Sequence, residues 1–362
     1  MRIGPDSDQL ELRDSMRNIL AKSCPPTLVR ACYDNPRGWQ ELWTIATELQ
    51  WTSLACRGLP TAGADIGLTT LDLVLALEVC GQALAPIPFV SSIGMAAGAA
   101  RCAGSALTEL IDEIVCGAVV VLAVQPVGQR LPGVPMRSMG GRIQGSAICV
   151  PDAVHAEVVL TLVSDGDATS LVALRGNEFS VIPDESADPS RPLATVEVDT
   201  PRRPVPLVDV ESVLAPALLA VSSELVGVAQ GALQLAVPHA CSRTQFGAPI
   251  GSYQGIKHAL ADVHVGIERA RSLNYHAAAT LDDPQSASAE RFLACALAKA
   301  AAGEAAVTAS RTMIQVLGAL GQTWEHDAHL YLRRAWVGAA LLGDSSSLYH
   351  LVGKRYLERA AS

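Results

Sequence analysis

The residue types most suited to chemistry lie at 242–258, where the sequence reads Ser-Arg-Thr-Gln-Phe-Gly-Ala-Pro-Ile-Gly-Ser-Tyr-Gln-Gly-Ile-Lys-His. Arg243 carries a planar guanidinium, which binds a phosphate or diphosphate through two parallel hydrogen bonds. The Gly and Pro residues after it indicate a turn, and Tyr253-Gln254 open a second helix. This stretch therefore predicts a turn between two helices that binds a diphosphate.

Two later segments add polar and glycine residues at regular spacing. The first, at 260–271, reads Leu-Ala-Asp and then Glu-Arg-Ala-Arg. The second, at 315–335, reads Gln-Val-Leu-Gly-Ala-Leu-Gly-Gln-Thr-Trp-Glu-His and ends in Leu-Arg-Arg-Ala. In this order, and together with the Arg-x-x-Phe-Gly…Gln stretch, the segments resemble the acyl-CoA dehydrogenase family. The resemblance is strong over residues 210–345 and weak over 1–205.

The resemblance implies that the chain takes part in binding FAD. In the family, the matching segments bind the adenine diphosphate of an FAD held by a neighbouring subunit, and glycine lets the backbone approach closely. Carried over residue by residue, the cofactor-binding set is Arg243, Gln245, Phe246, Tyr253, Gln254, Gln315, Gly318 and Ala319. Ala319 stands where the family usually has a second glycine, so its methyl group narrows this approach.

The family reaction also needs a carboxylate base, and neither family location holds one here. Most members carry a glutamate after the Arg-Arg-Ala helix, at the position of Leu342. Others carry it early in the first bundle helix, at the position of Ala217 or Leu218. A hydrocarbon side chain cannot accept the α-proton of an acyl-CoA. The resemblance therefore implies no catalytic residue in this chain.

Two carboxylates are the candidates to replace the missing base. Glu224 lies seven residues beyond Ala217, on the same helix face about two turns further on. Similar Glu-Leu-Val-Gly text occurs in relatives whose base lies elsewhere, which favours a structural role for Glu224. Asp344 lies two residues past the expected glutamate and has a shorter side chain, and a misplaced base acts poorly.

The middle of the chain also departs from the family. The family's Thr-Glu-Pro…Gly-Ser-Asp loop over the flavin corresponds here to Ala-Val-Gln-Pro-Val-Gly-Gln-Arg at 123–130, with Gln125-Pro126 as a remnant. The family has an aromatic near the flavin ring, but residues 141–151 contain neither Trp nor Tyr. The half of the site that holds the flavin ring is therefore eroded, whereas the half lent to a neighbour's adenine is kept.

In its missing base and its eroded flavin half-site, the chain resembles the non-catalytic β subunit of α2β2 heterotetramers. Actinobacteria use these heterotetramers on steroid side-chain CoA thioesters. In those enzymes a homologous partner supplies the base. The resemblance implies an acyl-CoA substrate and an electron-transfer flavoprotein as acceptor. Two alternatives stay open: a self-sufficient homotetramer that uses Glu224 as base, and a non-enzymatic acyl-CoA binder or scaffold.

Three parts must position these residues. Residues 1–115 have helical periodicity, and residues 116–206 are Val-rich runs separated by Gly, Pro, Asp and Ser, which indicate a small antiparallel β domain. Residues 207–362 predict long helices in a four-helix bundle, the last interrupted at Gly338 or Gly343. Arg333 and Arg334 are expected to pair with Glu304 or Asp327. The fold class is mainly α with a β insert, as in acyl-CoA dehydrogenases.

Composition restricts the partners. The net charge is −9 and aromatic residues are only 4%, which argues against nucleic acid and favours close-packed helices. The most apolar runs, such as 115–124 and 213–221, are shorter than the roughly 20 residues of a membrane span. The nine cysteines show no CxxC spacing, so reduced core residues in a cytoplasmic protein are expected, without a metal site.

Overall fold

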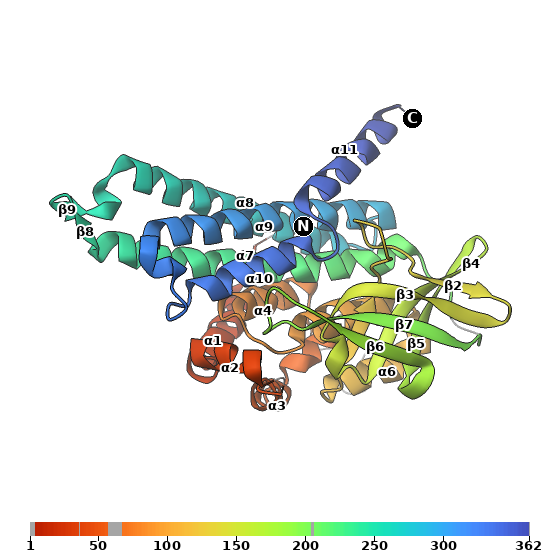
Figure 1. Cartoon of the computed structure of the whole chain (residues 1–362). Helices are drawn as coiled ribbons and strands as arrows, with labels where there is room; N and C mark the ends of the chain where they lie inside the picture. The colour runs from red at the N-terminus through yellow and green to blue at the C-terminus, as the bar shows by residue number, and fades with distance from the viewer. Residues whose placement is uncertain (1–3, 36, 57–66, 204–205, 362) are drawn as a thin grey trace.

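The computed structural model describes residues 4–35, 37–56, 67–203 and 206–361 (Figure 1). The first part is helical: α1 Ser7–Ser23, α2 Pro26–Asp34, α3 Gln40–Glu48, a 3-10 turn Trp51–Cys56, α4 Thr70–Gln82, a π-helical segment Phe89–Ala96, α5 Ala97–Cys102, a 3-10 turn Gly104–Leu107 and α6 Thr108–Val115. Helix α4 is fixed at its start by the last residue of a bundle helix. Asp282 accepts hydrogen bonds from the Thr70 backbone N–H and hydroxyl, at 2.8 and 2.5 Å. The N-terminal helices are thereby attached to the bundle.

A seven-stranded sheet follows, with strands β1 Val120–Ala123, β2 Met136–Met139, β3 Arg142–Pro151, β4 Val158–Asp165, β5 Ala168–Arg175, β6 Phe179–Asp184 and β7 Leu193–Pro201. The prediction of a purely antiparallel domain is wrong in one respect, because β4 pairs in parallel with both β1 and β2. Strand β4 lies between β5 on one edge and β1 and β2 on the other. Its first six residues are all buried, which explains an apolar run without alternation.

The third part is the bundle of long helices, α7 Val210–Ser242, α8 Gln254–Asp282, α9 Ser288–Leu317, α10 Ala328–Ala340 and α11 Ser345–Ala361. The predicted fourth helix is broken between α10 and α11, where Leu342 and Gly343 both have left-handed φ values of 57° and 102°. Gly338 lies inside α10 and does not interrupt it. In Figure 1, α11 leaves the bundle at an angle, and the C-terminus lies away from the other helices. Helices give way to strands after residue 115, and strands give way to helices after residue 206, near the predicted boundaries. A division into separate domains stays a prediction.

Helices α4 and α7 cross with their backbones in contact. A Cβ added to Gly227 would lie 1.9 Å from the Glu78 carbonyl oxygen, and one added to Gly81 would lie 2.1 Å from that of Glu224. Only glycine fits at such a crossing. The contact fixes Glu224 on the side of α7 that faces the N-terminal helices.

Two helical runs are long and apolar enough to cross a membrane by length and composition, Val210–Ser242 and Ser288–Gln322. The statement that the apolar runs are too short is therefore wrong for the helices as they form. Burial inside the protein accounts for their composition, because their most apolar windows are 94% and 72% buried. The cysteines also differ in part from expectation. Cys24, Cys32, Cys80 and Cys295 are buried as expected, but Cys102, Cys116, Cys149 and Cys241 are exposed.

Candidate functional site

The Arg243 stretch forms a projecting hairpin at one end of the bundle, as Figure 1 shows at the far left. Strands β8 Thr244–Gln245 and β9 Ala248–Pro249 pair, and a 3-10 turn Ile250–Ser252 leads into α8. The Phe246 ring is 94% exposed, and Phe246 and Gly247 have φ values of 52° and 83°. The Tyr253 hydroxyl donates to the carbonyls of Gln245 and Phe246, at 3.1 and 3.2 Å. Tyr253 thereby holds the strained tip in place.

Arg243 is exposed, and its guanidinium has no hydrogen-bond or ion-pair partner within the described parts of the chain. Gln254 is the first residue of α8 and is also exposed. The hairpin therefore presents an unpaired cation, an exposed aromatic ring and backbone groups on one projecting surface. Together these groups fit an aromatic nucleotide that carries a diphosphate.

The second predicted segment lies at the same end of the bundle. Gln315 is exposed on the last turns of α9, and Gly318 ends this helix with a left-handed φ of 62° and open space around its Cα. Ala319, in the turn Gly318–Gln322, is exposed. Burial lowers the pKa of His239, and the charges of Arg243 and His326 lower it further. The hairpin and the segment that follows α9 are thus close enough to act on one side chain.

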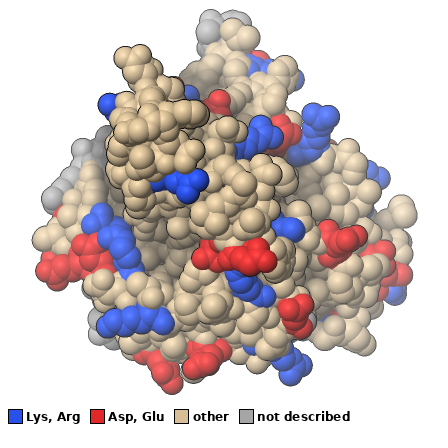
Figure 2. Space-filling view, turned by 60° about the vertical axis from the view of Figure 1, so that its left-hand side comes forward, with Lys and Arg blue, Asp and Glu red and all other residues tan. Residues whose placement is uncertain are grey.

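In Figure 2 the left-hand side of Figure 1 comes forward, including the end that carries the hairpin. The visible Lys and Arg residues are scattered among Asp, Glu and uncharged surface, with no basic band on this face. A binding site here would therefore rely on individual side chains such as Arg243 rather than on a broad positive field.

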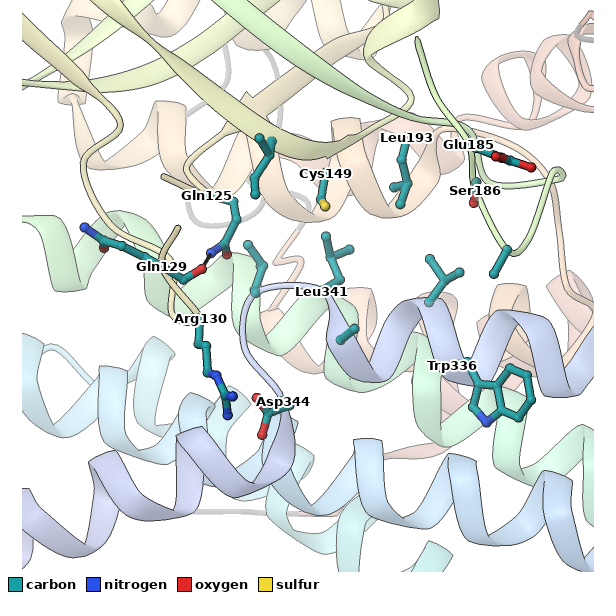
Figure 3. Close-up of a pocket in the computed structure, with 15 residues that line it drawn as sticks. Gln125, Gln129, Arg130, Cys149, Glu185, Ser186, Leu193, Trp336, Leu341 and Asp344 are labelled. Carbon is teal, nitrogen blue, oxygen red and sulfur yellow. Dashed lines mark hydrogen bonds between the residues drawn. The ribbon is translucent and has the colours of Figure 1, made fainter. Parts of the chain in front are cut away.

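A separate pocket of about 460 Å³ lies between the sheet and the turn that joins α10 to α11. Figure 3 shows its lining, which comes from the 125–130 loop, strands β3 and β7, residues 185–187 and α10. Leu342, which the sequence predicts at the position of the family's base, is buried and forms part of the wall. Of the two substitutes, Asp344 lines the pocket and Glu224 does not.

The Asp344 carboxylate is occupied by its own helix. It accepts from the Ser347 backbone N–H at 3.0 Å and from the Ser347 hydroxyl at 2.8 Å, and so caps α11. The Ser347 backbone N–H lowers the pKa of Asp344, and the charge of Arg130 acts in the same direction. A carboxylate whose pKa is lowered accepts a proton less readily, so these contacts oppose a role as base.

Glu224 belongs to a buried ionic cluster that joins the bundle to the 185–192 loop. Its Oε1 accepts from Arg191 and, at 2.9 Å, from Arg334. Arg334 also donates to the Asp188 carboxylate at 2.5 Å and to the Ser190 hydroxyl at 3.0 Å. Burial alone would lower the pKa of Arg334, but Asp188 and Glu224 outweigh it and raise the pKa. Glu224 is thus a counter-ion for two arginines, as the favoured structural role predicts.

The predicted ion pairs of Arg333 and Arg334, two arginines within α10, with Glu304 or Asp327 are wrong. Arg334 pairs with Asp188 and Glu224, and Arg333 donates to the Ala187 carbonyl at 2.8 Å. Glu304 pairs with Arg269 instead, and Asp327 pairs with Arg30. These partners are distant in sequence, so spacing along a helix gave no sign of them.

Sequence reasoning also missed Lys299, which is fully buried in α9. Its ammonium donates to the carbonyls of Ala339 and Gly343, each at 3.0 Å, on either side of the Leu342 turn. Burial lowers the pKa of Lys299 to about 7. The available signal was a single lysine within the Ala-rich apolar stripe of a long helix.

Gln125, predicted to be a remnant of the flavin loop, is 8% exposed and is fixed by its own amide nitrogen. Nε2 donates to the carbonyls of Gln129 at 2.7 Å and Leu131 at 3.3 Å. Its Oε1 is buried and has no hydrogen-bond partner among the residues that the structure describes. An unpaired buried acceptor of this kind costs about 1–3 kcal/mol. Nearby, Cys149 forms part of the pocket wall at a bulge in β3, with a left-handed φ of 53°.

The order of helices, sheet and long-helix bundle, with the Arg243 hairpin between α7 and α8, defines the class of protein: the chain belongs to the acyl-CoA dehydrogenase family. Residues 210–357 match the family description "Acyl-CoA dehydrogenase, C-terminal domain". Among individual relatives, the chain is 31% identical over 344 residues to the acyl-CoA dehydrogenase IpdE2 of Mycobacterium tuberculosis, covering 93% of this chain and 94% of that protein. It is 28% identical to IpdE2 of Mycolicibacterium smegmatis, over 92% and 93% of the two chains.

Solved structures share the whole fold. The Tcur3481-Tcur3483 steroid ACAD variant superposes with a TM-score of 0.87 at 23% identity, over 98% of this chain and 99% of that one. The ChsE4-ChsE5 complex from Mycobacterium tuberculosis superposes with a TM-score of 0.86 at 21% identity, over 99% of both chains. The predicted fold class, mainly α with a β insert, is confirmed.

Proposed function

We propose that this chain is the base-less subunit of an FAD-dependent acyl-CoA dehydrogenase, assembled as an α2β2 heterotetramer with a homologous chain. One observation carries the proposal. Leu342, the predicted position of the family's base, is buried in the pocket wall, while the hairpin that would serve a neighbour's cofactor keeps an exposed Arg243 with no hydrogen-bond or ion-pair partner among the described residues. Supporting contacts are those of Asp344 and Glu224, which tie up both substitute carboxylates.

In this proposal the residues of this chain bind and orient the adenine end of the cofactor. Arg243 would hold the diphosphate, and the Phe246 ring would cover apolar surface of the nucleotide. Gln315 would supply amide hydrogen bonds, and Gly318 would allow a close backbone approach. FAD, when bound, accepts a hydride from the acyl β-carbon. The partner's glutamate would remove the α-proton, because the side chain of Leu342 in this chain is a hydrocarbon and cannot accept a proton.

The substrate belongs to the proposal as well. Similarity to a solved steroid ACAD supports a CoA thioester with a steroid-type acyl group. An electron-transfer flavoprotein is the proposed acceptor of the electrons, as the family implies. Cytoplasmic localisation follows from the same proposal.

The first test is the FAD content and native mass of the chain, purified alone and after co-expression with its homologous partner. The proposal expects little flavin in the chain alone. It expects one FAD per two unlike chains in a tetramer after co-expression. A stable homotetramer with one FAD per chain would contradict it and return attention to Glu224 and Asp344.

The same preparations separate the two alternatives. A homotetramer that uses Glu224 as base predicts a yellow protein whose Glu224→Gln variant is inactive, and full activity in a folded variant would exclude it. The two arginines already bound to Glu224 oppose this alternative. A scaffold or acyl-CoA binder predicts no dehydrogenation of any acyl-CoA with any partner chain.

A further inference from the structure

The pocket between the sheet and the α10–α11 turn has an apolar middle. Ile148, Leu193, Val337 and Leu341 are among the side chains that form it. Its volume is about 460 Å³. At roughly 30 Å³ for each water-sized group, this volume holds on the order of 15 non-hydrogen atoms. A compact ligand of two or three fused rings fits this size.

The charges at the two ends of the pocket do not suit a diphosphate. At one end Arg130 lies beside Asp344, and the two interact electrostatically (Figure 3). At the other end lies Glu185, and Arg130 is the single cation among the lining residues that the structure describes. Two phosphate charges would meet one cation and two carboxylates, so a neutral molecule is favoured over an anion.

Both ends instead present hydrogen-bond acceptors that have no partner among the described residues. Gln125 cannot turn its amide over, because its oxygen would then face the carbonyls of Gln129 and Leu131. Its Oε1 therefore stays without a hydrogen-bond partner among the described residues, on a side chain that lines the pocket. At the far end the exposed Glu185 carboxylate has no hydrogen-bond or ion-pair partner in the described chain.

We infer that this pocket binds a neutral, hydroxylated alicyclic molecule and does not transform it. The fused rings occupy the apolar middle, and hydroxyl groups donate to Gln125 Oε1 and to the Glu185 carboxylate. Leu342 keeps the ligand unreacted, since it offers no base. The inference rests on the proposed function in one respect: the pocket of this chain is not the place of a flavin ring.

The test is calorimetric titration of the co-expressed complex with 2-decalol and with its methyl ether, which has the same rings but no O–H donor. We expect the alcohol to bind about tenfold more tightly than the ether, the usual value of one hydrogen bond to a buried acceptor. In Gln125→Met the preference for the alcohol should disappear, and in Glu185→Gln it should weaken. Ala340→Trp, at the exposed edge of the pocket, should abolish binding, whereas Ala106→Trp, exposed on the N-terminal part, should not.

Each outcome bears on the inference. Equal affinity for alcohol and ether, or unchanged binding to Ala340→Trp, would overturn it. The FAD content of the same sample separates its failure from that of the proposed function. One FAD per two chains without decalol binding would overturn the inference alone. One FAD per chain without decalol binding would overturn both.

Discussion

Lys299 shows how a single buried lysine can shape the turn between α10 and α11. Its ammonium bridges the carbonyls of Ala339, at the end of α10, and Gly343, in the turn. Carbonyls at a helix C-terminus attract a cation, which offsets part of the cost of burying the charge. The Leu342–Gly343 backbone, left-handed at both residues, is thus held by a side chain from another helix.

The lowered pKa of Lys299 gives a pH-dependent stability. The folded chain has a pKa of about 7 at this group, and the ordinary value is 10.5. Between these values the unfolded chain holds a proton that the folded chain has lost, so stability rises with pH by up to about 1.4 kcal/mol per unit. We expect the free energy of unfolding of the wild type, minus that of Lys299→Met, to increase from pH 6 to pH 9. Denaturant unfolding of both proteins from pH 6 to pH 9 measures this difference. A difference that stays constant with pH would contradict the prediction.

Glu224 offers a second prediction at the residue scale. Glu224→Gln leaves Arg191 and Arg334 buried with less negative charge, so it should destabilise the chain by about 3–5 kcal/mol. Glu304→Gln is the matched control, because the Glu304–Arg269 pair is about half exposed and should contribute less than about 1 kcal/mol. Denaturant unfolding compares them. Equal, small effects would show that the buried cluster contributes little.

At the scale of elements, the crossing of α4 and α7 depends on two glycines. Gly227→Ala would push a methyl group against the Glu78 carbonyl, so we expect a loss of about 1–3 kcal/mol or more. Gly266→Ala in α8 is the control, since a Cβ there meets nothing within 4 Å and should stabilise the helix by about 0.5–1 kcal/mol. Thermal unfolding of the two variants shows whether each one is stabilised or destabilised. A stabilised Gly227→Ala would mean that the helices separate easily at this crossing.

Local patterns predict the elements better than they predict the contacts between them. The period of 3.6 residues, the Val-rich runs and the Arg243 stretch are local, and the long helices, the hairpin and most strands form where these patterns indicate. Strands β2 and β3 lie outside the Val-rich runs. The parallel pairing of β1 and β2 with β4 depends on residues about 30 to 40 positions apart, whose pairing no local pattern records. The Glu224–Arg334 pair and the two carbonyls bound by Lys299 are likewise long-range.

For the whole molecule, the two halves of the predicted cofactor site lie far from one another in the architecture. The Arg243 hairpin projects from one end of the bundle, and the pocket with Leu342 lies between the sheet and the α10–α11 turn (Figure 1). The proposed function therefore uses a second chain to complete a site that includes the hairpin. This arrangement allows one half to lose its chemistry while the other keeps its binding residues.

The separation leads to a prediction for the assembled complex. Arg243→Gln removes one charged donor from a surface side chain without disturbing a packed contact, so the tetramer should keep its native mass. Loss of a charge-assisted hydrogen bond costs about 1.5–3 kcal/mol, so FAD should bind roughly 10- to 100-fold more weakly. Arg137→Gln, an exposed arginine on β2, should leave FAD binding unchanged. Flavin fluorescence during dilution measures how much FAD each variant retains. Equal FAD retention in the two would mean that the Arg243 side chain does not hold the cofactor.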